Sequence, residues 1–88
     1  MVLNRGVSIA LVTTGDNLGN YIIYLHGNAI IKHENNHIFV CDGNYKLTRA
    51  TKDTLITLLG GTFNKSTYMI HGLMIELSSE WQSINARA

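Results

Sequence analysis

Four histidines and a single cysteine are the residues whose types could bind a metal ion. His33 and His37 flank Glu34-Asn35-Asn36, and a three-residue turn there would place the two rings opposite each other on one sheet face. Zinc needs three or four ligands at about 2 Å in a tetrahedral array. Cys41 would share the face of His37 but lie about 13 Å from it along an extended strand. We therefore expect no metal site and no cofactor.

Residue types used in nucleophilic catalysis are present, but their spacing does not favour an enzyme. No Gly-x-Ser-x-Gly elbow presents a serine. Gly60-Gly61 follows a predicted helix, whereas a phosphate-binding loop precedes one. Nothing near Cys41 in the sequence would lower the pKa of its thiol, so we interpret Cys41 as a small buried hydrophobic residue. We expect a non-enzymatic protein without catalytic residues.

Aromatic and basic residues interleave at Tyr45, Arg49 and Lys52, a pattern typical of nucleic-acid binding. Aromatic rings stack on bases, and basic groups contact phosphates. The net charge is only +1, and Asp42 and Asp53 offset part of the local positive charge. These residues therefore indicate at most weak, salt-sensitive binding of a single strand.

Aromatic and methionine residues in the C-terminal third are of the types enriched at protein interfaces. Tyr68, Met74 and Trp81 are the candidates for contact with a protein partner. With 45% hydrophobic and 15% charged residues, a chain this small has difficulty burying all its apolar side chains. An exposed edge strand could also pair with a partner or with a second copy.

The length of 88 residues indicates a single domain over residues 1–88. The sequence contains no apolar run of the ~20 residues needed to span a bilayer. One cysteine cannot form an internal disulfide, and the N-terminus lacks a signal-peptide pattern. These features favour the cytoplasm.

Short β-rich runs separated by turn residues dominate the N-terminal half. Residues 7–11 alternate like a strand but also fit helical spacing, and a loop is expected over residues 15–20. Strands are predicted over residues 21–25, 29–33 and 37–41, with turns at His26-Gly27-Asn28 and Glu34-Asn35-Asn36. Together they predict an antiparallel meander closed by Asp42-Gly43-Asn44.

The hydrophobic period changes at Thr48, a predicted N-cap. Leu55, Leu58 and Leu59 recur at helical spacing with Thr51 and Lys52 off their face, so we predict one amphipathic helix over residues 48–59. Residues 62–77 return to strand character and predict a hairpin. Residues 78–88 fit either a short helical turn or a frayed tail.

These elements predict an α+β fold: an antiparallel sheet of four or five strands, from a meander plus a C-terminal hairpin, with the helix packed on one face. Apolar residues on the other face would mark a partner surface if they cluster, namely Ile23, Ile31, Phe39, Ile70 and Leu73. The expected core is Ile22, Tyr24, Ile30, Ile38, Val40, Leu55, Leu58, Leu59, Phe63, Met69 and Ile75.

A recurring order of short motifs runs through residues 21–75. The motifs are Leu25-His26-Gly27-Asn28, Gly43 with Tyr45, Thr48 and Thr51-Lys52 before Leu55, and Phe63-Asn64-Lys65 before Tyr68-Met69-Ile70. In this order the chain resembles a loose group of small uncharacterised proteins encoded by tailed bacteriophages. It departs from the group at Thr54-Leu55-Ile56, where the group often has a basic-apolar-polar triplet. The resemblance implies viral origin and this architecture, and it carries no known activity.

From these features we expect a phage-encoded protein that binds a host or phage protein in the infected cytoplasm and blocks a host macromolecular complex, such as a defence or regulatory complex. The alternative is a weak single-stranded nucleic-acid-binding protein that uses Tyr45, Arg49 and Lys52. No membrane association is expected. The sequence leaves open whether the chain forms a homodimer.

Overall fold

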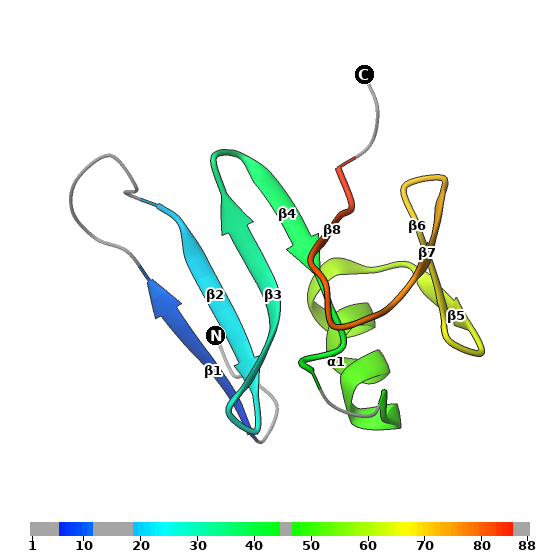
Figure 1. Ribbon diagram of the computed structural model, residues 1–88, viewed down its shortest axis with the longest axis horizontal. Coiled ribbons are helices and arrows are strands. Elements are labelled where there is room, and N and C mark those ends of the chain that lie inside the picture. Colours follow the sequence, from blue (N-terminus) through cyan, green and yellow to red (C-terminus); the bar gives the residue numbers. More distant parts are fainter. Residues whose placement is uncertain (1–5, 12–18, 45–46, 86–88) are drawn as a thin grey trace.

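The computed structural model describes residues 6–11, 19–44 and 47–85 (Figure 1). Antiparallel strands in the order β1-β2-β3-β4-β8 form a large sheet of five strands, and β5-β6-β7 form a small sheet of three. The predicted α+β class is confirmed, although the C-terminal hairpin region forms a sheet of its own. The elements are β1 (Val7–Leu11), β2 (Tyr21–Leu25), β3 (Asn28–Glu34), β4 (His37–Val40), α1 (Arg49–Leu59), β5 (Thr62–Asn64), β6 (Thr67–Ile70), β7 (Leu73–Glu76) and β8 (Gln82–Ser83).

Of the two alternatives for residues 7–11, the structure contains the strand. β1 pairs with β2 from Val7↔Leu25 to Leu11↔Tyr21. Most of the loop predicted over residues 15–20 lies outside the described residues. Asn20, at its end, accepts a hydrogen bond from the backbone N–H of Asn35 at 3.2 Å.

The described hairpins turn on two residues each, one fewer than predicted at residues 26–28 and 34–36. The first residue of each turn has a positive φ, between 51° at His26 and 58° at Lys65. Two-residue turns of this hand match the right-handed twist of the strands that they join. The turns are His26-Gly27, Asn35-Asn36, Lys65-Ser66 and His71-Gly72.

A β-bulge in β3 changes which side chains enter the core. β2 and β3 pair as Ile23↔Ile31 and then as Tyr24↔Ala29, so Ile30 is an extra residue. The neighbours Ile30 and Ile31 are consequently both buried, at 1% and 0% exposure. The prediction that Ile31 lies on the outer face is wrong because the bulge interrupts the alternation.

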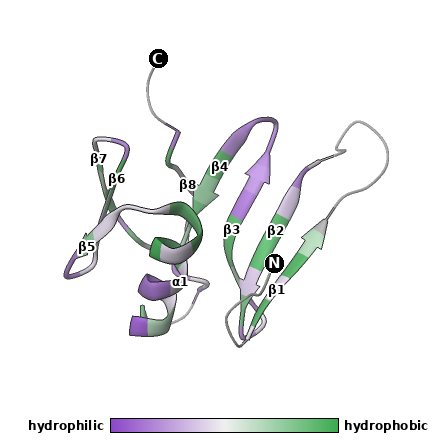
Figure 2. Ribbon diagram, turned by 180° about the vertical axis from the view of Figure 1, so that it is seen from behind, coloured by the Kyte–Doolittle hydropathy of each residue, from purple (hydrophilic) through white to green (hydrophobic). Residues whose placement is uncertain are grey.

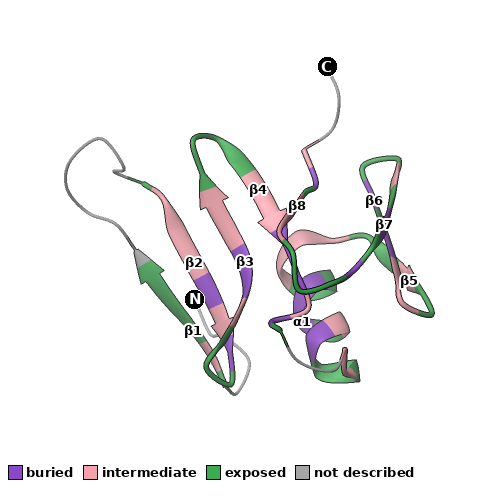
Figure 3. Ribbon diagram, in the orientation of Figure 1, coloured by how far each residue is buried: buried purple, intermediate pink, exposed green. Residues whose placement is uncertain are grey.

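One hydrophobic cluster joins the large sheet, α1 and the small sheet. Figure 3 shows the buried segments of β2, β3 and α1, and the exposure of most of β1 and the turns. The predictions that Ile22, Tyr24 and Met69 belong to the core and that Ile23 and Ile70 lie on the outer face are wrong, since the opposite face of each strand is the buried one. Confirmed core residues are Ile30, Val40, Leu55 and Ile75, with Ile38, Leu58, Leu59 and Phe63 packed against them; Ile23, Leu25, Tyr68, Ile70, Leu77 and Ile84 complete the cluster.

Helix α1 begins after Thr48, the predicted N-cap, whose hydroxyl accepts a hydrogen bond from the N–H of Thr51 at 3.2 Å. Its buried residues are Thr51, Thr54 and Leu55, so the prediction that Thr51 lies off the buried face is wrong. Thr51 and Leu55 are four residues apart and share a face. The Thr54 hydroxyl donates to the carbonyl of Ala50 at 2.7 Å, which satisfies its buried oxygen.

Figure 2 shows the hydrophilic first turn of α1 and its hydrophobic C-terminal end, which leads toward the small sheet. None of the helical structure in residues 6–11, 19–44 and 47–85 has the length and apolar character needed to cross a membrane.

The C-terminal segment is a strand, not the helical turn or frayed tail that was predicted. β8 pairs with β4 at Phe39↔Ser83 and Val40↔Gln82. Beyond it, Asn85 accepts a hydrogen bond from the N–H of Ile38 at 2.7 Å and donates to the carbonyl of Asn36 at 3.0 Å. Hydrogen bonds between residues nearly fifty positions apart in the sequence thus hold this segment in place. A local sequence pattern could not predict them. Residues 86–88 lie outside the description.

Candidate functional site

The prediction that His33 and His37 lie opposite each other on one sheet face is wrong, because the turn between β3 and β4 has two residues. Glu34 pairs with His37, and His33 pairs with Ile38. The two histidines therefore lie on opposite faces of the large sheet. His33 stacks on Tyr21 with the ring centroids 5.0 Å apart, whereas His37 tilts against Phe39 at 6.3 Å. In the described part of the chain, no three His, Cys, Asp or Glu side chains gather as metal ligands.

Cys41 is buried at the end of β4 and is held by two hydrogen bonds. Its thiol donates to the carbonyl of Ala29 at 3.1 Å, and its sulfur accepts from the N–H of Gly43 at 3.4 Å. Burial raises the pKa of the Cys41 thiol, although the Gly43 hydrogen bond and the Lys32 charge oppose that shift. A buried thiol with a raised pKa is a poor nucleophile near neutral pH. Cys41 therefore acts as a small packed residue directly after β4.

Tyr68, a predicted partner contact, belongs to the core at 0% exposure. Its ring stacks on Phe63 with a centroid separation of 4.6 Å, and its hydroxyl donates to the carbonyl of Gly60. Burial raises the pKa of Tyr68 to about 12. Because strand alternation turns Tyr68 inward, it cannot be an exposed anchor, and the prediction for this residue is corrected.

Met74, the second predicted contact, is 76% exposed on the outer face of the small sheet. It pairs directly with Met69, which is 39% exposed, so the two side chains lie side by side. They border an open groove of about 580 Å³. We name it the methionine groove, formed by Leu59, Met69, Leu73, Met74 and the turn His71-Gly72. No Lys, Arg, Asp or Glu is among the described residues that line it.

The turn of the methionine groove is anchored to the C-terminal segment. His71 Nδ1 lies 2.8 Å from the carbonyl oxygen of Ile84, at hydrogen-bonding distance. On the same hairpin, Glu76 accepts hydrogen bonds from the hydroxyls of Ser66 and Thr67, which lower the pKa of its exposed carboxyl group. These contacts tie down the hairpin that carries the two methionines, whose unbranched side chains can adapt to the shape of a partner.

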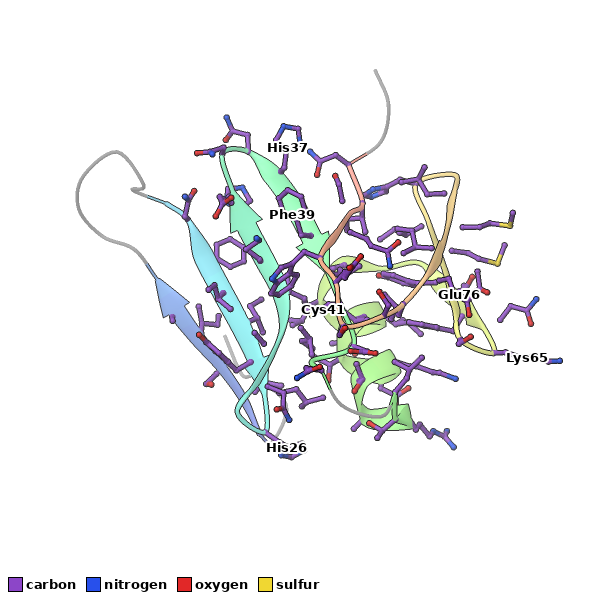
Figure 4. The ribbon with its side chains drawn as sticks, viewed as in Figure 1. His26, His37, Phe39, Cys41, Lys65 and Glu76 are labelled. Carbon is purple, nitrogen blue, oxygen red and sulfur yellow. The ribbon has the colours of Figure 1, made fainter. Side chains whose placement is uncertain are left out.

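Trp81, the third predicted contact, lies with the large sheet and not with the methionines. The ammonium of Lys32 is 5.0 Å from the Trp81 ring centroid and 4.9 Å from that of Phe39. All three side chains are half-buried. Figure 4 shows Phe39 and His37 on the same strand, β4. We call the cluster of Lys32, Phe39, Trp81 and His37 the aromatic face.

A second hollow of about 270 Å³ begins at Trp81 and runs toward the end of β4. Its polar side chains are Asn28, Asn44 and Ser79, which are all exposed. Backbone of Gly27 and Gly43 forms part of its wall, at positive φ values of 82° and 81°. The hollow adjoins the aromatic face through the Trp81 side chain.

The basic patch of the alternative prediction does not assemble into an aromatic site in the described residues. Tyr45 lies outside them. Arg49 is exposed and pairs with Asp53, with a distance of 3.8 Å between Nε and Oδ2. The ammonium of Lys52 lies 5.7 Å from the Phe63 ring centroid, so its stem covers part of the core.

Sequence reasoning misses Lys32 as a site residue and assigns Met69 to the core, although it does place Phe39 on the outer face of the sheet. A signal for Lys32 and Phe39 was present. With a two-residue turn at Asn35-Asn36, Lys32 falls opposite Phe39. The residue type of Met69 is one enriched at interfaces, but either face of β6 is apolar enough to be buried, so the sequence does not decide which face is exposed.

Comparison with protein-family models, with curated proteins and with solved structures finds no match to this chain. The site is therefore interpreted from its geometry.

Proposed function

We propose that this chain is a small phage-encoded, non-enzymatic protein that binds a host or phage protein through the methionine groove and blocks the complex in which that partner acts. The observation that carries the proposal is the directly opposed pair Met69 and Met74, at 39% and 76% exposure above an open apolar groove. The motif order shared with small phage proteins supports the viral part of the proposal.

The pairing of the exposed methionines distinguishes them from the other exposed hydrophobic residues of the described chain. Ile9 is 46% exposed on β1 and Ile56 is 38% exposed on α1, on separate elements. Single exposed hydrophobic residues are ordinary on a protein surface, whereas contiguous ones mark interaction sites. Methionine side chains also adapt to partners of different shape.

The occupant that fits best is an extended apolar segment of a protein partner. The described lining contains no Lys, Arg, Asp or Glu and consists largely of apolar side chains, so it suits an apolar segment better than a phosphate backbone. β7 is an edge strand of the small sheet, with β6 on one side only, and an added strand can pair along such an edge. Leu73 and Met74 are consecutive and lie on opposite faces of β7, so an extended segment at β7 would place its alternate apolar side chains against Met74 on the outer face.

Affinity capture from host lysate tests the proposal when it compares two matched double variants. Met69→Gln with Met74→Gln keeps the length of the side chains but makes the groove polar. Ile9→Gln with Ile56→Gln changes two exposed hydrophobic residues elsewhere, at 46% and 38% exposure. We expect the first variant to lose a partner that the wild type and the control retain, and nuclease treatment to leave that partner bound.

Thermal unfolding of both variants provides the control for folding. If the folded groove variant retains every captured partner, the proposal is wrong. It is equally wrong if sedimentation shows a wild-type dimer that becomes a monomer in the groove variant while no other protein is captured. In that case a second copy of the chain occupies the groove.

A further inference from the structure

The aromatic face holds a lysine ammonium between two rings on neighbouring strands. Lys32 of β3 is directly opposite Phe39 of β4, and Trp81 precedes β8, which pairs with β4 on its other side. The ammonium lies about equally far from the two ring centroids, at 4.9 Å and 5.0 Å. Among the described residues, no carboxylate forms an ion pair with Lys32. The charge is therefore positioned by the rings and stays available to an anion.

The hollow beside Trp81 adds groups that can form directional hydrogen bonds. Asn28, Asn44 and Ser79 provide amide and hydroxyl donors and acceptors within one space. Its volume of about 270 Å³ is below the range of roughly 300–1,000 Å³ typical of sites for drug-sized ligands. A flat heterocycle the size of a nucleobase suits a hollow of this size that has an indole at one end.

From this arrangement we infer that the aromatic face binds a short stretch of single-stranded nucleic acid. One base stacks on Trp81 and presents its edge to the amides of Asn28 and Asn44. A neighbouring base stacks on Phe39, and Lys32 contacts the phosphate between the two. Aromatic rings on a sheet with a basic residue between them are the common arrangement for unpaired strands. An acidic peptide would use Lys32 but leave the rings and the amides without partners.

The charges around the aromatic face predict weak dependence on salt. Lys32 is one cation, and Glu34 lies two residues along the same face of β3. Each phosphate contact contributes about 0.7 to the slope of log affinity against log salt concentration for a single strand. We therefore expect a slope near −0.7, with most of the affinity from stacking.

Trp81 is the single tryptophan of the chain, so its fluorescence reports on this face without a label. Titration with a short oligothymidylate and with a short oligouridylate should quench the emission to saturation. A blunt duplex of equal length should quench it much less, since its bases are already stacked. No quenching by either single strand, or equal quenching by the duplex, would overturn the inference.

Three single variants separate stacking from charge. Phe39→Leu removes one stacking ring and should weaken binding about five-fold or more. Lys32→Met keeps the stem of the side chain, removes the charge, and should bring the salt slope close to zero. Lys65→Met removes the same charge from an exposed turn of the small sheet, where Lys65 points away from the protein, and should change neither quantity (Figure 4).

Binding that Lys65→Met weakens as much as Lys32→Met would indicate nonspecific attraction, and it would overturn the inference. Unchanged affinity in a folded Phe39→Leu variant would also overturn the inference. The double variant of Met69 and Met74 should bind the oligonucleotides normally, so failure of the methionine groove and failure of the aromatic face are distinguishable.

Discussion

The hydroxyl of Tyr68 and the carbonyl of Gly60 form a hydrogen bond that joins the small sheet to the C-terminal end of α1. Tyr68 is fully buried, and its hydroxyl also lies 3.4 Å from the carbonyl of Leu55. The ring fills the space between the helix and the small sheet. The hydroxyl provides a hydrogen-bond donor to carbonyl groups at the C-terminal end of the helix, where the last carbonyls have no partner within the helix.

Tyr68→Phe should lower the free energy of unfolding by about 1 kcal/mol. The ring and its packing on Phe63 remain, but the Gly60 carbonyl loses its donor. Urea denaturation at neutral pH measures the change. A loss below about 0.3 kcal/mol would mean that water replaces the hydroxyl without cost.

Alkaline pH should remove the contribution of Tyr68. Burial raises its pKa to about 12 in the folded protein, from an ordinary value of 10.0. The folded state therefore holds this proton more tightly, so the contribution is complete below pH 10 and is lost as pH rises toward 12. The difference in unfolding free energy between wild type and Tyr68→Phe should shrink over this interval. A constant difference would contradict the raised pKa.

Leu55→Ala should lower stability by about 2–5 kcal/mol, because its side chain is fully buried in the shared cluster. Leu58→Ala should cost clearly less, since Leu58 is only half-buried. The hydrophobic period alone predicts equal burial for the two leucines. The ratio of the stability losses in the two variants therefore tests which face of α1 is buried. Equal losses in denaturant unfolding would show that α1 packs with a different face.

Asn85→Ala should lower stability by about 1–2 kcal/mol, because Asn85 makes two hydrogen bonds across the β3–β4 hairpin end. Asn85→Asp is the matched variant: it keeps the acceptor for the N–H of Ile38 and loses the donor to Asn36. We expect it to recover part of the lost stability. Hydrogen exchange at the Ile38 amide, fast in the alanine variant and slow in the aspartate variant, is the direct readout.

Excess chelator should leave the thermal midpoint unchanged. Within the described residues no set of three ligand side chains gathers, and His33 and His37 lie on opposite sheet faces. Structural zinc contributes directly to folding energy, so its removal would lower the midpoint by several degrees. A drop that added zinc restores would contradict this interpretation of the two histidines.

Local chemistry accounts for what could be predicted. The hydroxyl of Thr48 caps the helix, and Gly27, Asn35, Asn36 and Gly72 adopt positive φ in three of the tight turns. These effects act within a few residues, so they can be predicted from composition and spacing. Met74 and Trp81 could likewise be selected by residue type, although type alone could not place them on two different surfaces.

The choice of buried face required the tertiary structure. β2 carries apolar side chains on both faces, and the shared hydrophobic cluster contains Ile23 and Leu25 from one face of it. The same holds for β6, where Tyr68 is turned inward and Met69 outward.

The amino-acid sequence alone therefore establishes the α+β class, the helix and the positions of β2, β3 and β4, because short-range hydrogen bonding and periodicity govern them. The separation into two sheets, the strand at residues 82–83 and the meeting of Lys32, Phe39 and Trp81 are decided in the folded chain. They depend on contacts between residues up to about fifty positions apart, which a local sequence pattern does not contain.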